Sequence, residues 1–359
     1  MKPLMKHEFK RILVPALILL AINCIAHGFV LNWNIASYAD EYVKGIVLGG
    51  RPFVEYVLDT YVFVLIANAA TIMWLVYSQF HEDKAEGTGD FIATLPYTQK
   101  DKFIKKVLIG VIAIFISFVI SIIIQYTLFD TYSYYIENEF SMSIFEKDLI
   151  AQAGYSNTLG VMVNSYLGLV IWYLFLVVVQ YSVYNTVGSI AIAGLGILSI
   201  PYIFLGIIRY LGLAINSNID SFEPIINVFG SIVMCIVPIQ YKSICYKNGV
   251  QGEGISALSS NYYISLLILI CIAVILFIVG KGLAQKYGLR TRKNFMINKV
   301  VEYIFKIIVT LALGITPVLI LEVISEIETF GVVIVTLLMI LAGSIGYIIS
   351  NKITMRGRE

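Results

Sequence analysis

Charged residues are scarce in this sequence. Asp, Glu, Lys and Arg make up only 13% of its 359 residues, whereas a typical soluble domain has roughly 25%. Hydrophobic residues make up 59%, and the mean hydropathy is +0.85. This composition excludes an ordinary soluble domain. Because hydrocarbon cannot satisfy free backbone N–H and C=O groups, it predicts an all-α integral membrane protein.

Residues typical of enzyme and metal sites are also rare. The three histidines are scattered along the chain, and no HExxH, GxSxG or paired-cysteine spacing occurs. The G-x-x-x-x-G-K-[ST] phosphate loop is missing, because the nearest string, residues 280–282, lacks the upstream glycine and the hydroxyl residue. The sequence therefore predicts no enzyme activity, no catalytic or metal site and no directly bound cofactor. Nucleic acid is not an expected ligand.

Only four cysteines occur. Cys24 and Cys271 lie inside apolar runs, whereas Cys235 and Cys245 share a loop region and could pair only on an oxidising side of the membrane. The expectation is that all four are thiols.

Apolar runs long enough to cross a bilayer recur along the chain. The eight predicted transmembrane helices cover residues 12–31, 58–79, 107–129, 158–182, 188–213, 262–280, 303–324 and 332–350. A further apolar run, 225–240, is shorter and contains Gly230 and Pro238. It is either a short span or a re-entrant segment.

Lysine and arginine are distributed asymmetrically between the loops. With a cytoplasmic N-terminus, segments 1–11, 80–106, 281–302 and 351–359 lie in the cytoplasm and contain 18 Lys and Arg, against 5 in the opposite loops. This bias predicts a multi-pass protein of the cytoplasmic membrane with both termini in the cytoplasm. A ninth span at 225–240 would move the basic segment 281–302 outside, so we expect a re-entrant segment there.

The first eleven residues are patterned like an amphipathic helix. Lys6 and Lys10 share one helical face, while Met5 and Phe9 share another. This pattern predicts an interfacial helix on the cytoplasmic membrane surface. The alternative is a disordered positive flank that only orients the first span.

The cytoplasmic segment 80–106 mixes acidic and basic residues. Thr88 or Asp90 can cap a short helix whose Phe91, Ile92 and Leu95 share a face, and Pro96 ends it. A helix that is apolar on one face and charged around it suits docking into a groove of a soluble partner. The alternative is an ordinary interfacial loop.

A family resemblance rests on this segment. Glu86-Gly87-Thr88, then Leu95-Pro96, then the basic run ending at Lys106 resemble the first cytoplasmic loop of ABC-2-type permeases. The elbow helix, the coupling helix, the short turn between spans four and five, and the re-entrant segment of that family correspond here to residues 2–11, 88–96, 183–187 and 225–240. The resemblance covers the permease unit 1–290, with outer regions at 130–157 and 214–261.

The chain departs from the usual six-span unit by a two-helix extension, residues 291–359. In this respect it resembles eight-span exporters of small peptides in Gram-positive bacteria, including the phenol-soluble modulin exporter kind. The role of the added hairpin stays open.

The resemblance implies partners and a mechanism. Two permease chains, identical or paralogous, are expected to face each other in the lipid bilayer and to move an amphipathic peptide. Each is expected to rest its coupling helix on an ABC ATPase subunit that holds ATP and Mg. The residues expected to couple to that ATPase are Glu82, Glu86, Gly87, Thr88, Phe91, Leu95 and Pro96.

Polar residues inside spans are candidates for a translocation path, because each is costly in lipid. These candidates are Asn23, Asn68, Asn164, Gln180 and Arg209. The alternative for the amides is hydrogen bonding between helices. For Arg209 it is snorkelling to the interface.

Two other classes of function compete with an exporter. A secondary transporter predicts inverted repeats and acidic residues near the membrane midplane, and neither pattern is seen. A non-transporting immunity or sensor protein would bind a peptide at its outer surface and would need no docking helix.

Overall fold

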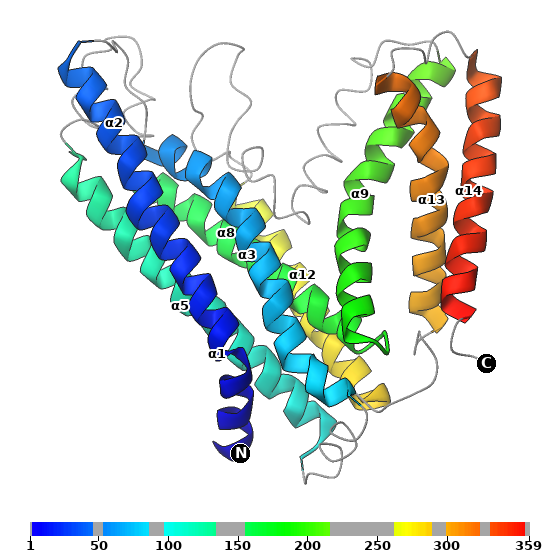
Figure 1. The fold of residues 1–359 in the computed structure, drawn as a ribbon, viewed down its shortest axis with the longest axis horizontal. Helices are drawn as coiled ribbons and strands as arrows, with labels where there is room; N and C mark the ends of the chain where they lie inside the picture. The colour runs from blue at the N-terminus through cyan, green and yellow to red at the C-terminus, as the bar shows by residue number, and fades with distance from the viewer. Residues whose placement is uncertain are drawn as a thin grey trace. The chain divides into compact units, whose positions relative to one another are not determined.

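The structure of the chain is a computed structural model (Figure 1) that describes residues 2–45, 53–85, 97–133, 155–215, 262–288, 299–323 and 331–355. Every element among these residues is a helix. Seven helices are long and apolar enough to cross a membrane. The prediction of an all-α multi-pass membrane protein is confirmed at this level.

Each predicted span overlaps a helix of the structure, and several helices extend beyond the predicted bounds. The elements in chain order are α1 (Lys2–Ile25), the π-helix η1 (Ala26–Val30), α2 (Leu31–Val43), α3 (Phe53–Lys84), α5 (Gln99–Thr131), α8 (Tyr155–Gln180), α9 (Thr186–Ile215), α12 (Tyr262–Tyr287), α13 (Lys299–Val323) and α14 (Gly331–Met355).

The second predicted span, 58–79, lies within α3 but is not among the seven candidate spans. Several of its side chains, at 58, 59 and 61–63, lie outside the described residues. An eighth span therefore stays a prediction. The re-entrant segment 225–240, Cys235 and Cys245 also lie outside the described residues.

The N-terminal rod, formed by α1, η1 and α2, differs from the prediction. Residues 2–11 are helical but continue without a break into the first span, and the candidate span runs over 38 residues from Leu4 to Glu41. Figure 1 shows the first turns of α1 at an angle to the rest, as expected where a proline such as Pro15 removes a helical hydrogen bond. Whether residues 2–11 lie on the membrane surface stays a prediction.

The sequence predicts an outer loop over residues 32–57 directly after the first span, and this prediction is wrong for residues 32–43. These residues form α2 because Leu31, Ile35 and Ala39 recur at helical spacing and are buried. Hydropathy alone missed this amphipathic continuation, because the charged and polar residues of its other face lower the mean hydropathy.

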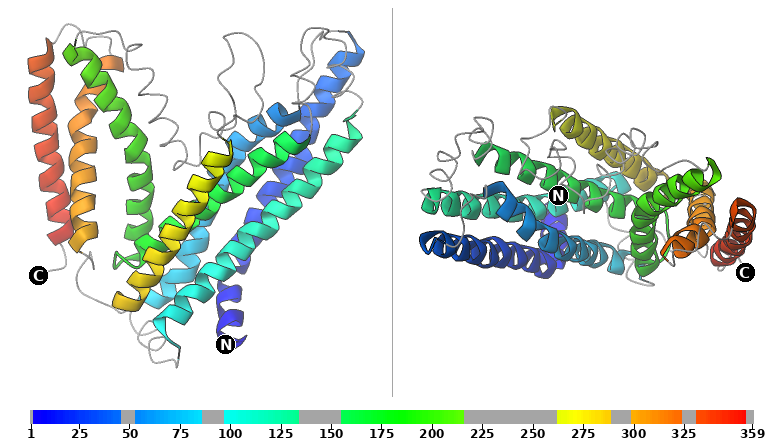
Figure 2. Two further views of the ribbon diagram at one scale, coloured as in Figure 1. Left: turned by 180° about the vertical axis from the view of Figure 1, so that it is seen from behind. Right: turned by 90° about the horizontal axis from the view of Figure 1, so that it is seen from above.

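The chain divides into two compact units. Unit 1 contains the N-terminal rod, most of α3 and α5, and the first parts of α8 and α12. Within it the N-terminal rod runs alongside α5 (Figure 2), where Ser117 Oγ donates to the Leu19 carbonyl at 3.4 Å. The predicted boundary near residue 290 rests on the resemblance and stays a prediction.

Unit 2 contains α9, α13 and α14, which stand side by side in Figure 1. Close packing of α13 and α14 depends on glycine. A Cβ on Gly346 would lie 3.0 Å from the Val309 carbonyl oxygen, and a Cβ on Gly343 would lie 3.7 Å from Gly314 Cα. Small residues that let backbones approach are the usual packing device between helices in lipid.

A short turn joins α8 to α9, as the sequence predicts, although it covers residues 181–185 rather than 183–187. The Asn185 side-chain oxygen accepts hydrogen bonds from the backbone N–H groups of Val187 at 2.8 Å and Gly188 at 3.3 Å. Asn185 is therefore the N-cap of α9.

Candidate functional site

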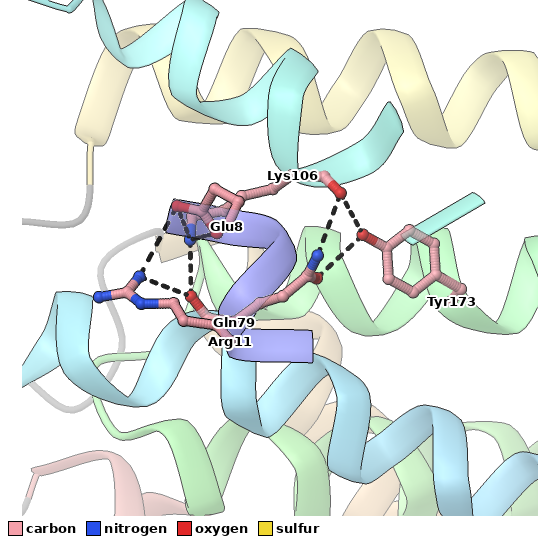
Figure 3. Close-up of polar contacts among 5 residues, drawn as sticks. All are labelled: Glu8, Arg11, Gln79, Lys106 and Tyr173. Carbon is pink, nitrogen blue, oxygen red and sulfur yellow. Dashed lines mark hydrogen bonds and ion pairs between the residues drawn. The ribbon is translucent and has the colours of Figure 1, made fainter. Parts of the chain in front are cut away.

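A buried ionic network joins four helices of unit 1 (Figure 3). We call it the Glu8 network, and its members are Glu8 and Arg11 from α1, Gln79 from α3, Lys106 from α5 and Tyr173 from α8. Glu8 is 3% exposed, and Gln79, Lys106 and Tyr173 are 0% exposed. Buried charges are costly unless they are paired, so the stability of this arrangement depends on the partners of each charged group.

Lys106 is the centre of the network. Its Nζ donates to both carboxylate oxygens of Glu8 at 2.9 Å and to the backbone carbonyl of Gln79 at 2.6 Å. Arg11 Nη1 lies 3.6 Å from the Glu8 carboxylate and donates to the same Gln79 carbonyl at 3.5 Å. Glu8 is thus bound by two cations, and the three N–H groups of Lys106 are used.

The second half of the network binds the backbone of α5. Gln79 Nε2 donates to the Lys106 carbonyl at 3.1 Å, and Tyr173 Oη lies 2.8 Å from the same carbonyl and 3.0 Å from Gln79 Oε1. Gly110 follows Lys106 by about one turn of α5. A Cβ there would lie 2.2 Å from Tyr173 Cζ, so only glycine leaves room for the ring in this position.

The positions of Gln79 and Lys106 give the network its functional interest. Gln79 comes directly before the predicted coupling segment 80–106, and Lys106 is its last residue. Direct contacts between them therefore hold the two ends of this segment together and tie them to α1 and α8. A fully satisfied buried network of this kind is a rigid element.

Sequence reasoning missed the Glu8 network. It treated Arg11 only as part of the basic flank that orients the spans, and Lys106 as the end of the basic run in the family resemblance. One available signal was Glu8, the only acidic residue before the first predicted span. The pairing itself could not be predicted, because Glu8 and Lys106 are 98 residues apart.

Lys84, at the end of α3, forms a separate buried site in unit 2. Its Nζ donates to Gln180 Oε1 at 2.7 Å, to the Val183 carbonyl at 2.8 Å and to Ser189 Oγ at 3.2 Å. Burial lowers the pKa of Lys84, and the neighbouring Asp83 carboxylate acts in the opposite direction. This site ties the start of the predicted coupling segment to the turn between α8 and α9.

The predicted pathway residues do not form one group. Asn23 and Asn68 pair reciprocally, with amide-to-oxygen distances of 2.9 and 3.1 Å. Gln180 binds Lys84. Asn164 is buried in α8 of unit 1, whereas Arg209 is partly exposed in α9 of unit 2.

A further polar contact in unit 1, unforeseen from the sequence, involves the π-helix. His27 in η1 is buried, and its Nδ1 lies 3.1 Å from Gln125 Nε2, which also lies 3.3 Å from Met162 Sδ. π-helical turns inside α-helices often coincide with functional positions, and this was a feature that hydropathy could not reveal.

The structure places part of the predicted coupling and interfacial sets. Glu82 is exposed in the last turn of α3, whereas Glu86, Gly87, Thr88, Phe91, Leu95 and Pro96 lie outside the described residues. Met5, Phe9, Lys6 and Lys10 are exposed on α1. Within the described residues, no group of His, Cys, Asp and Glu side chains could hold a metal ion.

No family model, curated protein or solved structure matches this chain.

Proposed function

We propose that this chain is the membrane-spanning permease subunit of an ABC exporter. In this proposal it moves an amphipathic peptide or other amphiphile across the cytoplasmic membrane, and a separate subunit hydrolyses ATP with Mg. The observation that carries the proposal is the Glu8 network. It holds together the two ends of the cytoplasmic segment that resembles a coupling loop.

In this proposal a soluble ATPase must move helices that lie in the membrane. ATP can change the helix arrangement only if its binding subunit interacts differently with the two arrangements. That difference reaches the spans through the coupling segment. A segment with loose ends would absorb the motion, whereas one whose ends are fixed by Lys106 and Gln79 passes it to α1, α5 and α8.

The Lys84 site supports the same mechanism from unit 2. Three acceptors hold the Lys84 ammonium at the turn between α8 and α9. A displacement of the first residues of the coupling segment is therefore transmitted directly to the start of α9. This second connection involves none of the residues of the Glu8 network.

The proposal includes a topology and an assembly. Both termini and segment 80–106 lie in the cytoplasm, in accordance with the distribution of Lys and Arg. Two permease chains, surrounded by lipid, contact two ATPase subunits. Glu82, Glu86, Gly87 and the apolar face at Phe91 and Leu95 form the contact with the ATPase.

Copurification tests the proposal. The tagged chain is isolated from its native membrane, and wild type is compared with a Glu86→Lys, Leu95→Asp double variant. We expect a soluble ATPase to copurify with wild type and to be lost from the variant. The matched control is a Glu41→Lys, Val43→Asp variant, which makes the same kinds of change at exposed positions of α2 and should retain the ATPase.

If no ATPase copurifies with wild type under conditions that preserve membrane complexes, the permease proposal fails. The immunity or sensor function would then take its place. Loss of the ATPase from the control as well would overturn the assignment of the contact to segment 80–106.

A further inference from the structure

An apolar groove runs between α1 and α5 on unit 1. Its volume is about 410 Å³, within the range of roughly 300–1,000 Å³ typical of small-molecule sites. Phe9, Leu13 and Leu17 line it from α1, and Ile112 and Ile116 line it from α5. These five side chains are all exposed, so the groove is open along its length.

The α1 wall of the groove is longer than the hydrocarbon of one bilayer leaflet. Its α1 wall extends from Met5 to Leu20, which corresponds to about 22 Å at 1.5 Å per residue. One leaflet contributes about 15 Å of hydrocarbon, half of the bilayer core. The α1 wall can therefore line an acyl chain from the headgroup region to the midplane, and α5 faces it over about 12 Å, from Ile109 to Ser117.

The charge at the groove is confined to one end. Lys6 is the only charged residue that lines it, and Ser117 is its only other polar residue. Lys105 stands one turn before Ile109, a lining residue of α5, on the same helical face. An apolar groove with a cation at its mouth is complementary to an amphiphile that has an anionic head.

We propose that the groove between α1 and α5 binds an anionic phospholipid of the cytoplasmic leaflet, with one acyl chain along the groove and the phosphate at Lys6. The cytoplasmic leaflet is the one that is rich in anionic lipid. The inference rests on the topology of the proposed function, which places Lys6 on the cytoplasmic side. It does not depend on coupling to an ATPase.

The charge also argues against a second copy of this chain as the occupant. In a two-fold interface the same patch meets itself. A dimer formed through this groove would bring two Lys6 side chains to one interface, and like charges oppose such contact. A lipid phosphate instead neutralises the lysine.

Lipid retention by the purified chain tests the inference. The protein is titrated with phosphatidylglycerol or phosphatidylcholine in mild detergent, and bound lipid is counted by native mass spectrometry. Wild type should retain phosphatidylglycerol preferentially. Lys6→Ala should reduce that preference about fivefold, the effect of one lysine near an anionic surface. Lys10→Ala, an exposed lysine of α1 that does not line the groove, should leave the preference unchanged.

A second pair of variants tests the apolar part of the groove. Ala113→Trp fills the groove and should abolish retention, whereas Ala21→Trp, at an exposed position of α1 outside the groove, should not. Equal effects of the two lysine variants, equal retention of the two lipids, or retention by Ala113→Trp would each overturn the inference. A change of oligomeric mass in Ala113→Trp would instead identify the groove as a contact between copies, which also overturns it.

The failure of this inference is distinguishable from failure of the proposed function. Lys6→Ala should still copurify with the ATPase, because Lys6 is not part of the coupling segment. Labelling of a Lys2→Cys variant from the cytoplasmic side tests the topology separately. Labelling from the outer side would place the groove in the other leaflet and overturn the lipid assignment while the copurification result stands.

Discussion

The Glu8 network of unit 1 and the glycine contacts between α13 and α14 of unit 2 hold their helices together by different means, although unit 2 has buried charges of its own at Lys84 and at the Glu302–Lys306 pair. Unit 1 uses buried charge, because Lys106, Glu8 and Arg11 bring α1, α3 and α5 together. In unit 2, α13 and α14 pack through glycines. Hydroxyl contacts there join α9 to the hairpin, Tyr202 to Thr316 and Tyr210 to Thr336, each at 2.9 Å.

This difference shows which contacts fix a single arrangement of the helices. A buried ion pair is weak evidence for stability, because desolvation offsets much of its attraction. It does fix one arrangement, since breaking it leaves a charge without a partner. Glycine packing brings the backbones of two helices into contact without burying a charge. The Glu8 network is therefore suited to transmit motion, and the hairpin of α13 and α14 to pack.

Removing the centre of the Glu8 network is the largest test of this comparison. Lys106→Ala leaves the Glu8 carboxylate buried with only Arg11 beside it, so we expect a loss of about 3–5 kcal/mol. Thermal unfolding of the solubilised protein measures the effect. Lys105→Ala, at the neighbouring and partly exposed lysine, is the control and should change stability by less than about 1 kcal/mol. A loss no larger than that of the control would show that the network is not a structural element.

Crowding the ring of Tyr173 should have the next largest effect. Gly110→Ala places a methyl group where Tyr173 Cζ and Oη already lie, so the ring must move. We expect a loss of about 1–3 kcal/mol. In a Tyr173→Leu background the same change should cost less, because the clash and the tyrosine hydroxyl are both gone. Equal losses in the two backgrounds would contradict the geometry.

The hairpin of unit 2 gives a smaller expected effect. The methyl group of Gly346→Ala would lie 3.0 Å from the backbone oxygen of Val309. Overpacking should lower the free energy of unfolding by about 1–3 kcal/mol. The helix preference of alanine over glycine, about 0.5–1 kcal/mol, offsets part of this loss. Gly343→Ala meets no atom closer than 3.6 Å and should be neutral or stabilising. Cross-linking between α13 and α14 would reveal whether only the first variant separates the helices.

The smallest expected effect concerns the paired amides inside unit 1. Asn23→Leu and Asn68→Leu should each cost about 0.6 kcal/mol, the average for hydrogen bonds between helices in membranes. The double variant should cost no more than either single variant, because both remove the same interaction. Additive losses would mean that the two asparagines act separately, as residues of a translocation path would.

Much of the fold could be predicted from the sequence, because lipid imposes simple constraints. Runs of apolar residues predicted the helices, and the short gap between two such runs predicted the turn before Thr186. The amphipathic extension of the first span to Val43 was missed, because its buried residues alternate with polar ones over only three turns. The π-helix at 26–30 was also missed, since no residue pattern marks it.

The candidate site was much less predictable than the fold. Glu8 and Lys106 could be identified as unusual residues near spans, but their partnership depends on how α1 and α5 pack. Lys84 was counted among the basic loop residues, although its ammonium lies among the acceptors near the α8–α9 turn. Helix packing decides which residues far apart in the chain become partners. Residue spacing along the sequence does not show how the helices pack.

The central claim is that the Glu8 network fixes the ends of the coupling segment so that a soluble ATPase can act on the spans. The most direct test is ATP hydrolysis by the copurified complex in lipid vesicles, relative to the ATPase subunit alone. Wild type should stimulate hydrolysis. A Glu8→Gln, Lys106→Gln variant, with Tyr173→Phe as a milder second variant, should bind the ATPase but lose that stimulation. Full stimulation by the double variant at equal assembly would contradict the claim.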